Sequence, residues 1–115
     1  MEDSALIASE RRFQLWSYTV SHGQLLLRSV KYAGYETRID VLFKDVGFIS
    51  LPAAFWGLRI YRTNLDMLRR VADMRFQYSD TAFRITTNDG NGYIAAASVA
   101  FHEDRGEYDE PSALL

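Results

Sequence analysis

The chain has 115 residues, a formal net charge of −2 and no cysteine. This length fits one domain that buries about two-thirds of its unfolded surface, and the absence of cysteine excludes a disulfide framework and thiolate zinc ligands. No stretch approaches the roughly 18 apolar residues of a membrane-spanning helix, and the acidic start does not fit a signal peptide. We therefore expect a soluble, cytoplasmic protein without a membrane span.

Charge is distributed unevenly along the chain. Residues 103–115 hold five acids and one base, a segment charge of −4, so residues 1–102 hold a net charge of +2. We expect residues 1–102 to form a single β-rich domain and residues 103–115 to form an acidic, disordered tail. A nearly neutral domain lacks the basic footprint of a nucleic-acid-binding protein, so nucleic acid is not an expected partner.

The first third of the chain predicts a short helix followed by a hairpin. Residues 4–12 fit a short helix with Ser4 as its N-cap. Residues 13–21 and 24–32 are rich in aromatic, β-branched and leucine side chains, and the glycine-containing turn at 21–23 joins them. Apolar side chains on both sides of these strands predict a pair buried on both faces, as in a rolled sheet or a small sandwich.

The segment TRIDVLFKDVGFISLP, residues 37–52, is the longest apolar-rich run with strand periodicity. Its first half alternates between apolar and charged side chains. The apolar side consists of Ile39, Val41 and Phe43, and the charged side, which we expect to face water, consists of Arg38, Asp40 and Lys44. The alternation slips after Lys44, so a bend or bulge is expected at residues 45–47, where Gly47 permits it.

The second half predicts more strands and one further helix. We expect strands at residues 58–62, 74–78, 83–87 and 93–102, a helix at 65–73 and a tight turn at 88–92. The predicted fold is α+β and mainly antiparallel β. It is a rolled sheet, or a small barrel or sandwich, of about seven strands with one or two short helices.

No pattern in the sequence identifies a reaction centre. His22 and His102 lie at a turn and at a strand end without a ligand spacing that demands a metal, and the adjacent Ser21 and His22 do not form a triad by proximity alone. The turn at 88–92 lacks the spaced acids of a calcium loop and does not lead into a helix as a phosphate cradle does. We expect no metal site, no cofactor and no enzymatic activity.

Aromatic and basic residues interleave between residues 55 and 62. Phe55 and Trp56 are adjacent, so both cannot enter one core from an extended strand, and one should lie at the surface. Ordinary packing of alternating side chains explains most of this pattern, and stacking on nucleic acid is a further alternative. Tryptophan, tyrosine and arginine are also frequent at interface hot spots. The candidate partner-binding residues are Phe55, Trp56, Arg59 and Tyr61.

Two resemblances rest on residues 18–51. YTVSHGQLLLRS, followed by TRIDVLFKDVGFISLP with its Asp45-Val46 bend, resembles the opening of bacterial pleckstrin-homology-like domains, which implies a seven-stranded bent barrel used for binding. The chain differs from that family at its end, where an acidic segment replaces an amphipathic helix. The same half is similar to small immunity-type proteins of bacterial toxin systems, in its Ser21-His22 pair and in the spacing of Val41, Phe43 and Val46.

Together these observations predict a non-enzymatic bacterial binding domain. A protein partner is expected, as in an immunity protein, with a homodimer through a sheet edge or through the loop at Phe55 and Trp56 as one form of contact. The alternative is a barrel-type module that binds a small ligand or a lipid headgroup. The identity of the partner or ligand and the biological process are not encoded in any motif of the sequence.

Overall fold

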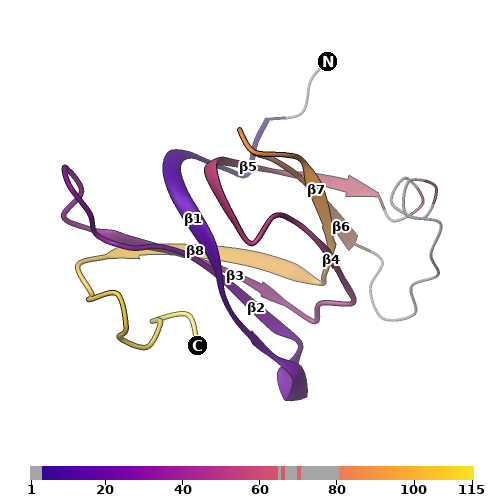
Figure 1. Ribbon diagram of the computed structural model, residues 1–115. Helices are drawn as coiled ribbons and strands as arrows, with labels where there is room; N and C mark the ends of the chain where they lie inside the picture. The colour runs from indigo at the N-terminus through magenta and orange to yellow at the C-terminus, as the bar shows by residue number, and fades with distance from the viewer. Residues whose placement is uncertain (1–3, 65, 67–69, 71–80) are drawn as a thin grey trace.

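The computed structural model describes residues 4–64, 66, 70 and 81–115 (Figure 1). Within these residues, eight strands form one sheet in the order β4-β7-β6-β5-β1-β2-β3-β8, and every strand pair is antiparallel. The strands are β1 (Ile7–Thr19), β2 (Gln24–Ser29), β3 (Arg38–Lys44), β4 (Phe48–Ser50), β5 (Ala54–Asn64), β6 (Thr81–Thr86), β7 (Gly92–Ala95) and β8 (Ser98–Asp104). The prediction of a mainly antiparallel β fold is confirmed.

The predicted N-terminal hairpin is present, but the predicted helix before it is wrong. β1 and β2 pair on either side of a short 3₁₀ helix at Val20–His22. The segment predicted as a helix instead starts β1, where Ile7 pairs with Ile60 of β5. A helix of this length is marginal by itself, so hydrogen bonding along the neighbouring β5 determines the local structure.

The bend predicted at residues 45–47 is confirmed, because these residues separate β3 from β4. The left-handed residue of the bend is Asp45, with a φ of 54°, rather than the glycine at position 47. Aspartate is one of the few residues that tolerate this conformation, since its short polar side chain can bond locally.

The strand predicted at residues 93–102 is divided in two. β7 lies between β4 and β6, whereas β8 pairs with β3. The bend between β7 and β8 lies against the bend between β3 and β4, because the N–H of Ala97 donates to the carbonyl of Lys44 and the N–H of Gly47 donates to the carbonyl of Ala95, both at 2.9 Å. Two bent segments therefore run side by side around one corner, and the sheet ends at β4 and β8.

The sheet wraps around a main apolar core. Its side chains come from β1, β2, β3, β5, β6 and β7, and the residue after β7 completes it. The buried members are Phe13, Leu25, Leu27, Val41, Phe43, Phe55, Leu58, Ile60, Phe83, Ile85, Ile94 and Ala96. The apolar side of the segment at 37–52 thus faces inward as predicted.

The outer face of β3, which carries the charged side chains expected to face water, is largely shielded from solvent. Arg38 is 3% exposed and Asp40 is 1% exposed, while Lys44 is exposed. Residues 105–115 cover this face (Figure 1). The guanidinium of Arg38 donates to the carbonyls of Glu107 at 2.9 Å, Glu110 at 2.7 Å and Pro111 at 3.2 Å. Residues 103 and 104 complete β8, so the structure differs from the expectation of a disordered tail.

The helix predicted at 65–73 and the strand predicted at 74–78 lie almost entirely outside the described residues. Among the residues that the structure does describe, no helix has the length and hydropathy needed to cross a bilayer.

Candidate functional site

The four residues predicted to bind a partner lie on different faces of β5. Phe55 is 1% exposed, and its ring stacks on Phe13 with the ring centroids 6.3 Å apart, so it belongs to the core and is not available to a partner. Trp56 is 47% exposed on the outer face. The expectation that one of these two adjacent aromatics lies at the surface is confirmed.

Arg59 and Tyr61 share the outer face with Trp56, and each already has a neighbour. The Arg59 guanidinium donates to a carboxylate oxygen of Glu10 at 3.0 Å. The Arg84 guanidinium lies 4.2 Å from the centre of the Tyr61 ring. Both contacts are at the surface, where such pairs contribute little to stability.

A bulge between β1 and β5 places Trp56 and Arg59 on the same face although they are three positions apart. Between the pairs Ser9–Leu58 and Arg12–Trp56, β1 has two residues where β5 has only Gly57. A bulge of this kind re-aims the neighbouring side chains. Gly57 has a φ of 76°, a left-handed conformation that glycine adopts without strain.

Trp56 lies beside two tyrosines of the loop between β2 and β3. Its ring meets Tyr32 edge to face with centroids 6.2 Å apart, and Tyr32 packs on Tyr35 at 4.9 Å. Tyr35 is 40% exposed. We call Tyr32, Tyr35 and Trp56 the aromatic patch. Sequence reasoning missed both tyrosines, although two tyrosines that flank an Ala-Gly turn were a usable signal.

A small depression opens at the aromatic patch. Its volume is about 180 Å³, and it is lined by Arg12, Gln14, Val30, Tyr32 and Trp56. This volume suits one side chain of a partner more than a whole small-molecule ligand, because ligand pockets are usually about 300–1,000 Å³. The mixture of apolar walls and a polar edge is typical of an interface pocket.

Arg11 fixes the loop that carries the two tyrosines. Its side chain is buried, and its guanidinium donates to the carbonyls of Val30 at 3.2 Å and Thr37 at 2.5 Å, which lie at the two ends of the loop. The same guanidinium lies 4.4 Å from the centre of the Tyr35 ring. Charge-assisted bonds from a planar group hold both ends of the loop in one geometry.

The turn predicted at 88–92 fixes the backbone of Trp56. The N–H of Trp56 donates to a carboxylate oxygen of Asp89 at 2.6 Å, and the N–H of Asn88 donates to the carbonyl of Trp56 at 2.8 Å. The patch is therefore supported from two sides, by Arg11 through the tyrosine loop and by this turn through the strand.

No family model, curated protein or solved structure matches this chain. The resemblances to pleckstrin-homology-like domains and immunity-type proteins therefore stay predictions.

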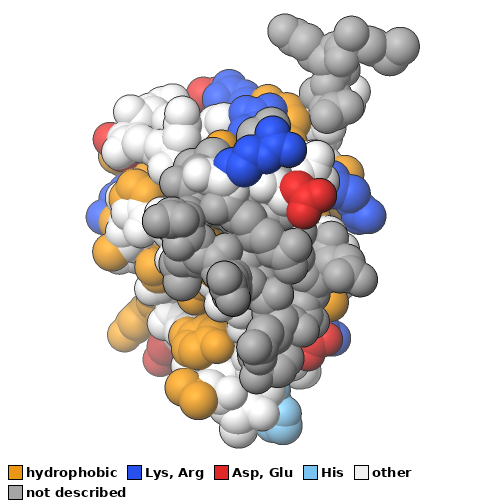
Figure 2. All heavy atoms as spheres, turned by 90° about the vertical axis from the view of Figure 1, so that its right-hand side faces the viewer, with side chains coloured by type: hydrophobic (Ala, Val, Ile, Leu, Met, Phe, Trp, Pro, Cys, Tyr) orange, Lys and Arg blue, Asp and Glu red, His pale blue; other side chains and the backbone are white. Residues whose placement is uncertain are grey.

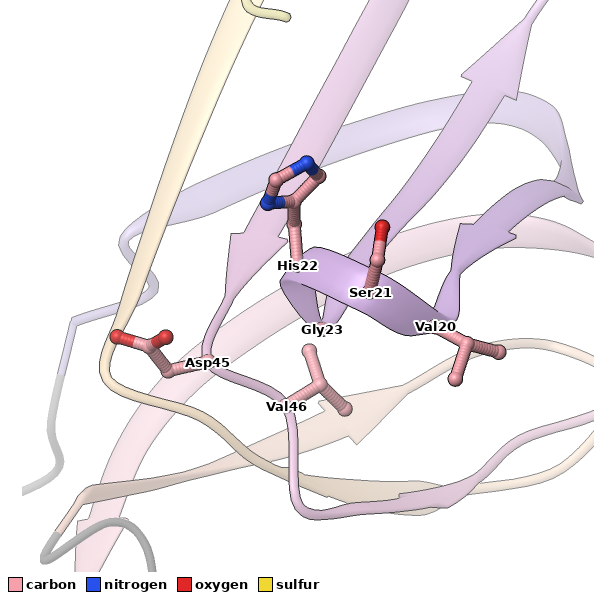
Figure 3. A pocket seen from close by; sticks show the side chains of 6 residues that line it. All are labelled: Val20, Ser21, His22, Gly23, Asp45 and Val46. Carbon is pink, nitrogen blue, oxygen red and sulfur yellow. The ribbon is translucent and has the colours of Figure 1, made fainter.

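A second candidate lies at the turn between β1 and β2 (Figure 3). It is an open depression of about 780 Å³ lined by Val20, Ser21, His22, Gly23, Asp45 and Val46. Figure 3 shows the Ser21 hydroxyl and the His22 ring pointing to the same side, with the Asp45 carboxylate farther along. Within the described residues, no hydrogen bond is found between the side chains of Ser21, His22 and Asp45.

The other histidine lies among structural ion pairs. His102 Nε2 is 3.5 Å from Asp104 Oδ2. The guanidinium of Arg38 donates to both oxygens of the same carboxylate, to Oδ1 at 3.0 Å and to Oδ2 at 3.2 Å. The Arg38 hydrogen bond, together with the N–H of Gly106, holds the pKa of Asp104 below its ordinary value, and the same bond raises the pKa of Arg38. In the described part of the chain, no group of three or more metal-ligating side chains could hold an ion.

A fully buried ion pair lies beneath the C-terminal segment. Arg28 donates to the two carboxylate oxygens of Asp40 at 2.7 and 3.1 Å, and both side chains are 1% exposed. The same guanidinium donates to the carbonyl of Tyr108 at 2.8 Å and lies 5.1 Å from the centre of the Trp16 ring. These contacts join the tail to the domain and leave neither charge open to a substrate.

Proposed function

We propose that the chain is a non-enzymatic domain that binds a protein partner through the aromatic patch. The observation that carries the proposal is the half-exposed Trp56 ring, held edge-on to Tyr32 above a depression of about 180 Å³. Large exposed aromatics beside a small pocket are typical of interface hot spots. Among the described side chains, no group of three or more His, Asp or Glu residues could hold a metal ion, so the proposal does not depend on a catalytic metal.

The rigidity of the patch supports binding. Ordering flexible side chains and loops on association costs free energy. Here the loop is held at both ends by Arg11, and Trp56 is held by the turn at Asn88 and Asp89. The patch therefore requires little further ordering to receive a partner.

The charge of the neighbouring surface favours a protein partner over nucleic acid. Arg59 is paired with Glu10 beside the patch. Figure 2 shows a different face of the molecule, on which acidic, basic and hydrophobic side chains all occur. Phosphate binding relies on basic groups that form a continuous field, and a mixed surface is poorly suited to it.

The resemblance to immunity-type proteins suggests one form of this function, the inhibition of a toxin by direct contact. A second candidate function, binding of a small ligand or a lipid headgroup, is favoured by the open depression around His22 and Ser21. The two candidates predict different contact surfaces. A shift of the NMR signals around Trp56 supports the first, and a shift confined to residues 20–23 supports the second.

The experiment is a selection of random peptides displayed on phage against the wild-type protein, followed by binding assays with variants. We expect the selected peptides to lose at least tenfold in affinity for Trp56→Ala, the size of an interface hot spot. Tyr18→Ala is the matched control, because Tyr18 is 45% exposed and lies outside the patch. Urea unfolding curves verify that both variants fold.

Peptides that bind Trp56→Ala as tightly as the wild type would remove the patch from the proposal. The same conclusion follows if Tyr18→Ala is the variant that loses binding, or if no peptide is selected.

A further inference from the structure

Among the strands that the structure describes, β8 forms one end of the sheet. It pairs with β3 on one side and is the last strand in the sheet order (Figure 1). Most of its side chains are exposed, and Phe101, at the centre of the strand, is 59% exposed. A terminal strand presents unpaired backbone donors and acceptors that can accept another strand.

Natural sheets usually protect such an edge, and β8 lacks most of the usual protection. Protective devices include very short strands, charged side chains and lysine above all, proline, bulges and a covering loop. β4, at the other end of the sheet, has only three residues. β8 has seven residues, contains neither lysine nor proline, and pairs with β3 in an unbroken register. Its two acids, Glu103 and Asp104, lie together at one end.

We propose that β8 pairs in antiparallel fashion with β8 of a second copy of this chain, about a two-fold axis at Phe101. In that register all seven residues of both strands have a partner. The facing pairs are Phe101 with Phe101, Ala100 with His102, Val99 with Glu103, and Ser98 with Asp104. No acid faces an acid, although like charges directly opposite each other are destabilising in a sheet.

Alternative registers are less favourable. An axis at His102 brings two histidines together, and an axis at Glu103 brings two carboxylates together. An axis at Ala100 leaves Glu103 and Asp104 without partners inside β8. The order of residues in the strand thus favours the axis at Phe101, where two exposed aromatic rings also cover each other.

The contact is small. Two seven-residue strands bury less than the about 800 Å² per partner of a stable interface. The dimer is therefore weak, and its population rises with protein concentration. It does not use Trp56, so it is independent of the proposed binding of a partner.

The chain contains no cysteine, so single cysteines report the register directly. In Phe101→Cys, the two thiols face each other with Cβ atoms about 4.5–5.5 Å apart, close to the separation that a disulfide requires. In the matched variant Ser98→Cys, also in an exposed position of β8, the two thiols are offset by six residues, about 20 Å. Each of the two cysteine variants is oxidised with copper phenanthroline, and its covalent dimer is detected on a non-reducing gel.

We expect a covalent dimer with Phe101→Cys and none with Ser98→Cys, and Trp56→Ala added to Phe101→Cys should leave the yield unchanged. Equal yields from the two cysteine variants, or no dimer from either, overturn the proposal. If Phe101→Cys does not fold, amide hydrogen exchange of the wild type decides. Exchange in β8 that slows at high protein concentration supports the proposal, and exchange independent of concentration refutes it.

Discussion

Removing one partner of the buried pair between Arg28 and Asp40 should destabilise the domain strongly. In Asp40→Ala, the Arg28 guanidinium keeps its bond to the Tyr108 carbonyl but loses both carboxylate bonds, and its side chain is only 1% exposed. A buried charge left without its partner costs about 3–5 kcal/mol. For 115 residues, an unfolding entropy of about 0.24 kcal/mol/K converts this cost to a fall in Tm of about 12–20 °C.

The assay is urea and thermal unfolding followed by tryptophan fluorescence, because the Trp16 ring lies 5.1 Å from the Arg28 guanidinium and reports on this region. The double variant Arg28→Met with Asp40→Leu is the informative comparison. Replacing both partners of a buried ion pair by apolar residues is often neutral or stabilising. The double variant should therefore recover most of the unfolding free energy that Asp40→Ala loses. A loss below about 1 kcal/mol in Asp40→Ala, or a double variant as unstable as the single one, would contradict the reasoning.

Two further predictions concern Asp104, at the end of β8, and Gly92, at the start of β7. Arg38 holds the pKa of Asp104 below its ordinary value of 3.8, so the ionised carboxylate stabilises the fold above that pH. This stabilisation is lost as the pH falls through the lowered pKa. In Asp104→Asn, the urea midpoint measured below pH 5 should therefore fall less steeply with acid than in the wild type. Gly92→Ala should cost about 1–3 kcal/mol or more in urea unfolding, since the added Cβ would lie 1.8 Å from the Ser50 carbonyl oxygen. Gly47→Ala, with no atom within 4 Å of its added Cβ, should change the midpoint little.

Local pattern was sufficient to predict much of the fold. The alternation in residues 37–52 indicated which side chains enter the core, and its slip located the bend at Asp45. The glycine-containing turn indicated the first hairpin. Adjacent aromatics at Phe55 and Trp56 implied opposite faces. In each case the information lies within a few residues, where the two-residue period of a strand applies.

The features that the sequence predicted wrongly, or did not predict, are determined by contacts between segments far apart in the chain. The sequence predicts a helix at residues 4–12 because no residue near Ile7 indicates that β5 lies beside it and supplies backbone hydrogen-bond partners. Arg38 and Asp40 look like solvent-facing residues until the tail covers them. The aromatic patch combines Trp56 with Tyr32, and only the bulge at Gly57 and the loop held by Arg11 bring the two together. A local period carries no information on such partners.

The C-terminal segment is attached mainly by its backbone. Arg28 and Arg38 bond the carbonyl oxygens of Glu107, Tyr108 and Glu110, which every amino acid possesses, so most substitutions there leave these bonds intact. A substitution of Glu107 also removes its side-chain bond with Lys31, at 2.8 Å. Gly106 is the exception, because an added Cβ would lie 2.5 Å from the Arg38 guanidinium. Within this segment, side chains can therefore vary, or be replaced to introduce an epitope, while the backbone hydrogen bonds to the domain are kept.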